Sequence, residues 1–324
     1  MSTSPVIDNW SRFWFADKPM LLLTIMRVAF GFFLITYFWN LQPILKMLFG
    51  TEGLVALGGS FPYQSSPVPT LFSVISDKSD GVVWFVTLLG MFSGTLLAAG
   101  IFSRLVPMLV WICVSSVVTT IPGNSGDILV QCYATLMVFA GLAGHLGKPF
   151  WQFPSGNKPA WSLRLFQIQI VLVYFFSGWH KLAYAVWHEG LAFHYVISQE
   201  YWSRFDLTWL ASYPVATSAL TTFVLFFEIL LFPVLVWVPA TRRLVLISGF
   251  VFHAAIFLLL KVFVFHQITL LFYLAFLTTE DILQFKNSMR YFKKLLFSED
   301  NRSREMGRKS VTLNNFVISK SPLD

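Results

Sequence analysis

Eight long apolar stretches constrain the fold of this chain more than any other feature of its sequence. A helix needs about 20 apolar residues to cross the roughly 30 Å hydrocarbon core of a bilayer, and the stretches have about that length. We therefore expect an all-α fold, a polytopic membrane helix bundle with about eight transmembrane helices. The predicted spans are residues 19–41, 82–102, 105–122, 127–145, 161–187, 215–239, 243–260 and 262–278.

The composition agrees with this expectation. Only 12% of the residues are charged, whereas a soluble domain has about 25%. The net charge is +7, but the basic residues lie between and after the apolar stretches, which does not indicate nucleic-acid binding. Cys113 and Cys132 lie inside apolar stretches and are expected to be buried thiols without a disulfide. The spacing of the histidines predicts no metal site.

The distribution of lysine and arginine predicts the orientation of the bundle. If both termini are cytoplasmic, the inner segments hold 17 basic residues and the outer loops hold 4, and cytoplasmic loops carry such an excess. We expect residues 1–18 to be a cytoplasmic N-terminal segment and residues 19–280 to be the transmembrane domain. Residues 281–324 are predicted as a basic amphipathic helix and a disordered cytoplasmic tail, with Thr278 and Asp281 as a cap at the helix start.

Two long segments are predicted to lie outside the membrane. Residues 42–81 are rich in glycine and proline, which favours irregular structure. Residues 188–214 are rich in aromatic side chains, which favours an ordered loop. The last two spans form one apolar run that is interrupted by Lys261 and His266, where we expect a tight turn.

Lys181 is the most informative single residue, because it lies near the end of the fifth apolar stretch. An ionisable side chain inside a membrane span is costly and by default functional. Four polar residues recur every seven positions and predict a polar stripe along one helix face. They are Gln167, Tyr174, Lys181 and His188. The alternative is that Lys181 extends to the lipid headgroups beside an aromatic belt.

Other polar residues in the predicted spans have competing interpretations. Arg27 and Glu228 are expected to form a structural ion pair, because intramembrane charges usually pair within the bundle. His253 is surrounded by apolar residues and is explained more simply as a packing residue than as a catalyst. Asp127 opens the fourth span, where its simplest role is an N-cap. The alternative for His253 and Asp127 is that either one reaches the site of Lys181.

The order of several short motifs resembles a known family. The core motif of vitamin K-dependent gamma-carboxylase is similar to Tyr174-Phe175-Phe176-Ser177-Gly178, Lys181-Leu182 and Trp187-His188-Glu189-Gly190. The bacterial relatives of that enzyme, the horizontally transferred transmembrane (HTTM) domain proteins, are equally similar. The resemblance spans about residues 19–280. Its supporting matches are Arg27-Val28-Ala29-Phe30-Gly31, Gly126-Asp127, Phe227-Glu228-Ile229 with Pro233, Arg242-Arg243 and Phe252-His253.

The resemblance implies a membrane enzyme that uses reduced vitamin K or another quinol. In the carboxylase the matching lysine deprotonates the quinol, so the resemblance implies that Lys181 is the base. A lysine must be neutral to act as a base, and an apolar site favours its neutral form. If either of them reaches the site of Lys181, His253 and Asp127 are the other expected catalytic residues. The expected quinol contacts are Tyr174, Ser177, Trp187 and His188.

Three functions are consistent with the sequence. The first is a carboxylase-like lyase in the lipid bilayer with a peptide or protein substrate on the outer face. The second is a non-catalytic HTTM protein that assists maturation or export of a secreted peptide. The third is a transporter, although the sequence shows no clear repeated halves. In every case we expect a multi-pass protein of the bacterial inner membrane.

If Lys181 is a base, Lys181→Ala is expected to abolish activity while folding stays near normal, because the substitution removes an intramembrane charge.

Reporter fusions test the predicted orientation of the bundle. A reporter fused after residue 145 should lie in the cytoplasm, and one fused after residue 187 should lie on the outer side. The reason is the excess of basic residues in the inner segments. The opposite pattern of reporter activity would overturn the orientation.

Overall fold

The computed structural model describes residues 5–19, 21–54, 70–75, 79–121, 124–147, 149, 156–278, 280–284 and 287. The chain divides into two units, residues 1–276 and 277–324. Nearly all of the predicted basic helix and tail lies outside the described residues of the second unit.

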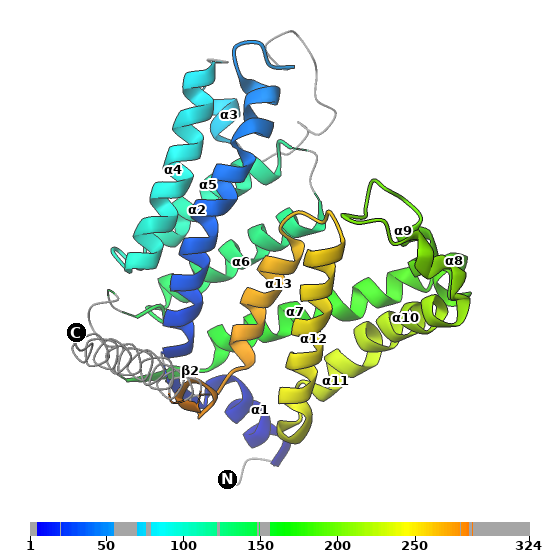
Figure 1. Ribbon diagram of the computed structural model, residues 1–324. Helices are drawn as coiled ribbons and strands as arrows, with labels where there is room; N and C mark the ends of the chain where they lie inside the picture. Colours follow the sequence, from blue (N-terminus) through cyan, green and yellow to red (C-terminus); the bar gives the residue numbers. More distant parts are fainter. Residues whose placement is uncertain are drawn as a thin grey trace, which may run out of the picture. The chain divides into compact units, whose positions relative to one another are not determined.

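The described part of the first unit is mainly helical (Figure 1). Each of the eight predicted spans overlaps one of the longer helical segments, and the all-α membrane bundle is confirmed. The α-helices are α1 (Pro5–Phe15), α2 (Leu21–Phe49), α3 (Leu71–Val74), α4 (Asp80–Ala99), α5 (Val106–Val118), α6 (Ser125–Leu142), α7 (Trp161–Lys181), α8 (Ala185–His188), α9 (Ala192–Ile197), α10 (Pro214–Phe226), α11 (Phe232–Leu235), α12 (Pro239–Leu259) and α13 (Phe265–Tyr273). The 3₁₀ helices are η1 (Thr208–Ser212) and η3 (Leu274–Phe276), and η2 (Phe227–Leu231) is a π-helix.

Five helical segments of the described chain are long and apolar enough to cross a membrane. They are α2, α4, α6, the continuous helix from α10 to α11, and α12. The apolar helices Val106–Val118 and Phe265–Phe276 are shorter, and α7 has 21 residues but carries the polar stripe. A total of eight crossings therefore stays a prediction.

Two predicted boundaries are wrong. The helix of the first predicted span, α2, continues to Phe49, past Pro43. It does so because Leu41, Leu45 and Leu48, which are 0–1% exposed, extend its buried face. The irregular structure predicted from residue 42 therefore begins later. The helix predicted to end at residue 187 ends at Lys181, and a turn separates it from α8.

Small residues allow α2 and α4 to pack closely along their lengths (Figure 1). A Cβ atom on Gly31 would lie 2.5 Å from the carbonyl oxygen of Gly94, and one on Gly90 would lie 2.5 Å from the ring of Phe38. Gly90 and Gly94 form a GxxxG pattern, which lets helix backbones approach in membranes. This contact needs glycine on both helices.

Arg27 is fully buried at the C-terminal end of α4. Its guanidinium donates to the carbonyl oxygens of Leu97 at 2.5 Å and Ala98 at 3.3 Å. The last carbonyls of a helix lack intrahelical partners and carry partial negative charge, so they suit a buried cation. The predicted Arg27–Glu228 ion pair is wrong, because Glu228 pairs with Lys181.

The segments predicted to share one side of the membrane also share one end of the first unit. At the predicted inner end, β1 (Asp17–Pro19) pairs antiparallel with β2 (Asn157–Pro159), and Phe13 contacts Trp237 with ring centroids 5.9 Å apart. At the other end, Lys46 pairs with Asp80 at 2.8 Å, and the N–H of Leu71 donates to Ser116 Oγ near the end of α5 at 2.9 Å. The alternation of inner and outer segments is therefore consistent along the chain.

The loop 188–214 is ordered and fastened to the turn between α12 and α13. The N–H of Arg204 donates to the Leu259 carbonyl at 2.8 Å, and the N–H of Lys261 donates to the Trp202 carbonyl at 2.7 Å. The Thr208 hydroxyl and N–H both donate to Asp206, and these bonds lower the pKa of that carboxyl. Where a tight turn was predicted near Lys261, residues 260–264 form a short non-helical connection, in which Leu260 makes a β-bridge with Ser203.

In the second unit, Thr278 and Asp281 form the predicted cap. The Thr278 hydroxyl donates to the Asp281 carboxylate at 2.7 Å, and the N–H of Asp281 donates to the Thr278 hydroxyl at 3.2 Å. Residues 280–284, which follow the cap, are helical.

Alanine substitutions test the glycine contact between α2 and α4. Gly31→Ala should lower the stability of the purified protein by about 1–3 kcal/mol, because its methyl group meets backbone atoms that cannot move aside. Gly81→Ala is the matched control, because the nearest atom to its methyl group is Ser79 Oγ at 3.5 Å. Thermal unfolding in detergent measures both; an equal midpoint for the two variants would contradict the close packing.

Candidate functional site

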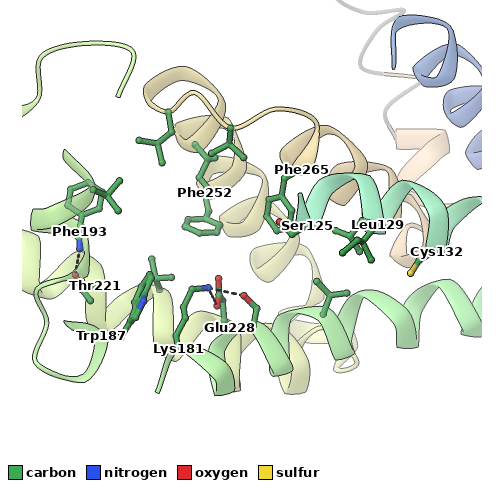
Figure 2. Close-up of a pocket in the computed structure, with 18 of the residues that line it drawn as sticks. Ser125, Leu129, Cys132, Lys181, Trp187, Phe193, Thr221, Glu228, Phe252 and Phe265 are labelled. Carbon is green, nitrogen blue, oxygen red and sulfur yellow. Dashed lines mark hydrogen bonds and ion pairs between the residues drawn. The ribbon is translucent and has the colours of Figure 1, made fainter. Parts of the chain in front are cut away.

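A cavity of about 530 Å³ lies between α6, α7, α10, α12 and α13 and is the candidate functional site (Figure 2). Most of its wall is apolar. Four aromatic side chains contribute to it, namely Trp187, Phe193, Phe252 and Phe265. The charged side chains in the wall are Lys181 and Glu228.

Lys181 forms a small polar cluster at the end of α7. Its ammonium makes an ion pair with the carboxylate of Glu228 and donates to Ser177 Oγ at 2.8 Å (Figure 2). The ammonium also lies 5.1 Å from the ring centroid of Trp187, within the range of a cation–π contact. The side chains of Lys181 and Glu228 are 20% and 8% exposed. Lys181 therefore does not simply extend toward headgroups.

The backbone around Glu228 explains how the carboxylate reaches Lys181. The Phe232 N–H donates to the Phe227 carbonyl, five residues back, so that the helix widens into a π turn at Glu228. Pro233 follows and has no N–H to continue the α-helical pattern. Such π turns are frequent at functional sites.

Gly178 lets α7 approach this π turn. A Cβ atom on Gly178 would lie 2.6 Å from Ile229 Cγ1 and 3.0 Å from Glu228 Cβ. Because Gly178 is one residue after Ser177 and three before Lys181, the close contact of the helices brings the carboxylate to both polar groups.

Tyr174 and His253 lie together but do not line the cavity. The Tyr174 hydroxyl is 2.5 Å from His253 Nε2 and 2.5 Å from the Tyr273 hydroxyl. All three side chains are buried. Phe252, beside His253, does line the cavity. The group of Tyr174, His253 and Tyr273 thus connects α7, α12 and α13 within the protein.

Asp127 also lies outside the cavity wall, and its predicted role as an N-cap is wrong. The cap of α6 is Asn124, whose side chain accepts from the Asp127 N–H at 3.2 Å. Asp127 completes the capping box and accepts a hydrogen bond from the Tyr37 hydroxyl at 2.9 Å. Asp127 is therefore held by α2 and by its own helix start.

Some of the remaining predicted site residues line the cavity and others lie outside it. Ser177 and Trp187 line the cavity with Lys181, whereas His188 is exposed at the end of α8 and does not line it. Gln167 donates to the Ala275 carbonyl at 2.7 Å. The stripe of α7 thus faces protein, while Phe176 on the other face is exposed.

Glu228, Thr221 and Phe193 also line the cavity, although no role in a binding site was predicted for them from the sequence. Thr221 Oγ1 accepts a hydrogen bond from the Phe193 N–H at 3.0 Å, which fixes α9 against α10 beside the cavity. Thr221 and Glu228 are seven positions apart and therefore lie on nearly the same helix face. This spacing was the sequence signal that could have predicted both residues in one site. Among the described residues, no group of His, Cys, Asp and Glu side chains could hold a metal.

Comparison with known families locates this cavity within one domain. Residues 125–280 match the HTTM domain. This family of transmembrane domains is related to vitamin K-dependent carboxylase, and the resemblance inferred from the sequence motifs is confirmed over that range. All residues that line the cavity lie within it, from Ser125 to Phe265.

The HTTM domain and the apolar helices identify an integral membrane protein. The motif around Arg27 lies before the matched residues. No curated protein and no solved structure matches the chain.

The Lys181–Glu228 pair changes the expected behaviour of Lys181→Ala. Removing one partner of a buried pair leaves an uncompensated charge, which costs about 3–5 kcal/mol. Lys181→Met and Glu228→Leu should therefore each lower the unfolding midpoint strongly, and the double variant should recover most of the loss.

The exposed pair Lys46–Asp80 is the matched control, because exposed pairs contribute about 0–1 kcal/mol. Lys46→Met and Asp80→Leu should lower stability little. Additive losses for Lys181→Met and Glu228→Leu in thermal unfolding would show that the two side chains are not energetically coupled.

Proposed function

We propose that the cavity binds a lipid-soluble quinol, such as reduced vitamin K, and that the protein is a carboxylase-like enzyme of the bacterial inner membrane. The quinol hydroxyl is placed at Lys181 and Glu228, and Lys181 is the base. One observation carries this proposal: the ion pair forms the polar end of a cavity whose other walls are mainly apolar.

The size and lining of the cavity support a quinol as the ligand. Its volume of about 530 Å³ falls within the roughly 300–1,000 Å³ of small-molecule pockets. Trp187, Phe193 and Phe252 offer flat apolar surfaces that suit an aromatic ring. Ile128 in the same wall is 54% exposed, so an isoprenoid tail can pass this side toward lipid.

Lys181 and Glu228 act on the ligand hydroxyl as one unit. When bound, a quinol supplies an acidic hydroxyl and two electrons. In the resting pair Lys181 is an ammonium and Glu228 a carboxylate, so Lys181 must first transfer a proton to Glu228 to become a base.

The neutral amine of Lys181 then takes the hydroxyl proton and becomes an ammonium again. In total, one proton moves from the ligand hydroxyl to the carboxylate of Glu228, and the ammonium of Lys181 lies beside the new anionic oxygen of the ligand. Ser177 contacts Lys181 Nζ and orients it. Trp187 covers the same ammonium and limits access of water. Glu228 is thus as necessary to the proposed chemistry as Lys181.

Three other predicted site residues support the cavity in this proposal without lining it. Tyr174 and His253 lie behind the cavity wall, and Asp127 lies at the start of α6. A peptide substrate would approach from α8 and α9, because Trp187 and Phe193 from these helices form the adjacent wall.

Thiol protection tests ligand binding. Cys132 lines the cavity and Cys113 is fully buried, so a maleimide should react first at Cys132. Reduced vitamin K should slow this reaction at least severalfold, and an analogue with both hydroxyls methylated should protect less. Mass mapping of the modified cysteine checks the site. Equal labelling with and without the quinol would refute binding in the cavity.

Activity assays test the chemistry separately from binding. With reduced vitamin K, dissolved oxygen as the electron acceptor, a glutamate peptide and labelled carbon dioxide, the native protein should incorporate label. Lys181→Arg should lose at least 100-fold, because arginine does not deprotonate in proteins, and Glu228→Gln should lose as much. Lys46→Arg and Asp80→Asn are matched controls in a pair remote from the cavity and should retain activity.

Two outcomes would overturn the catalytic role. An active Lys181→Arg variant would exclude Lys181 as the base. Protection of Cys132 without label incorporation, with several peptides tried, would favour the non-catalytic maturation factor over the carboxylase.

A further inference from the structure

The helix α1 has two distinct faces at the predicted inner end of the first unit. At 100° per residue, Val6, Ile7, Trp10, Phe13 and Trp14 share an arc of about 120°. The opposite arc carries Asp8, Asn9, Ser11 and Arg12. Val6 is 77% exposed and Trp10 is 64% exposed. An apolar face this exposed needs a partner that accepts aromatic and aliphatic side chains.

The helix is nevertheless fixed to the bundle at its C-terminal end. The guanidinium of Arg164 lies 4.3 Å from the ring centroid of Phe13, and its Nε donates to the Phe13 carbonyl at 3.1 Å. The N–H of Ala160 donates to the Ala16 carbonyl at 3.1 Å. These contacts hold α1 beside the start of α7 while leaving Val6 and Trp10 exposed.

The charges around α1 are mainly positive. Among the described residues at this end, seven are basic and two are acidic. The basic residues are Arg12, Lys18, Arg104, Lys158, Arg164, Arg242 and Arg243, and the acidic residues are Asp8 and Asp17. Apart from Asp127 in α6 and Lys181 in α7, the described opposite end has three basic residues, Lys46, Arg204 and Lys261, and five acidic residues, Glu52, Asp80, Glu189, Glu200 and Asp206.

Two lysines face each other directly in the strand pair. Lys18 is the partner of Lys158 in the antiparallel register, and both side chains are at least partly exposed. Like charges directly opposite each other destabilise a strand pair. An anion between the two ammonium groups would relieve this repulsion.

We propose that α1 and this strand pair form a binding surface for anionic phospholipid. Val6 and Trp10 enter the boundary between headgroups and acyl chains, and Lys18 and Lys158 together hold a lipid phosphate. An amphipathic helix with tryptophan on its apolar face is suited to this position, and an anionic leaflet attracts the lysine and arginine residues of the segments beside α1. The proposal is independent of the chemistry in the cavity.

Spin labels test the position of α1 in the full protein. With Cys113→Ala and Cys132→Ala as background, a nitroxide is attached at Trp10→Cys or, as the matched control on the polar face, at Asn9→Cys. In nanodiscs of phosphatidylcholine and phosphatidylglycerol, the label at position 10 should be accessible to oxygen and protected from a water-soluble nickel complex. Position 9 should show the reverse.

Two label outcomes would refute the proposal. Access of nickel to both positions would place α1 in water. Protection of position 10 from both reagents would indicate that protein, such as a second copy of the chain, covers it.

Lipid retention tests the lysine pair without a cysteine-free background. Native mass spectrometry should detect phosphatidylglycerol retained in preference to phosphatidylcholine. Lys18→Gln with Lys158→Gln should weaken this retention by on the order of tenfold, because each lysine near an anionic surface contributes to binding. The control is Lys46→Gln with Lys261→Gln, which removes the same charge at the opposite end. Equal retention by the two double variants would overturn the lipid site.

Discussion

The cost of placing charge in an apolar environment governs the arrangement of the membrane bundle. Lys181 and Glu228 come from helices distant in sequence, and each offsets part of the desolvation of the other. Arg27 meets the same constraint with the last carbonyls of α4. These contacts fix how α7 faces α10 and how α2 meets α4. The polar side chains therefore orient helices whose apolar surfaces have little preference for one another.

The same constraint separates two kinds of polar surroundings on α7. Tyr174 has buried partners in α12 and α13, which satisfy its hydroxyl completely within the protein. Lys181, two turns later, has partners but also borders open volume. A single stripe thus provides structural contacts in its middle and a charged group that borders the cavity at its end. Tyr174 and Lys181 differ because the neighbouring helices pack closely around Tyr174 but leave a cavity beside Lys181.

The sequence predicted the helices well, because apolar length is a local property that each segment carries by itself. It also predicted that Lys181 and Ser177 would share a site, because both belong to the motifs that resemble the carboxylase family. The partner of Glu228 was predicted wrongly, because charge alone does not distinguish Arg27 from Lys181. Only the glycine at 178 and the π turn, which determine distances between helices, select the second pairing. For the same reason Asp127 and His253 appeared closer to Lys181 than they lie.

The π turn at Glu228 also determines which residues can form one wall along the whole helix from α10 to α11. Thr217 and Val236 are both buried, yet 19 positions separate them. At about 100° per residue these two side chains would point roughly 100° apart on an uninterrupted α-helix. A turn that accommodates one additional residue removes this offset. The extra residue in the π turn thus rotates the second half of the helix back into line with the first. Thr217 and Val236 can then lie on one inner side, although 19 positions on a regular α-helix would turn them apart.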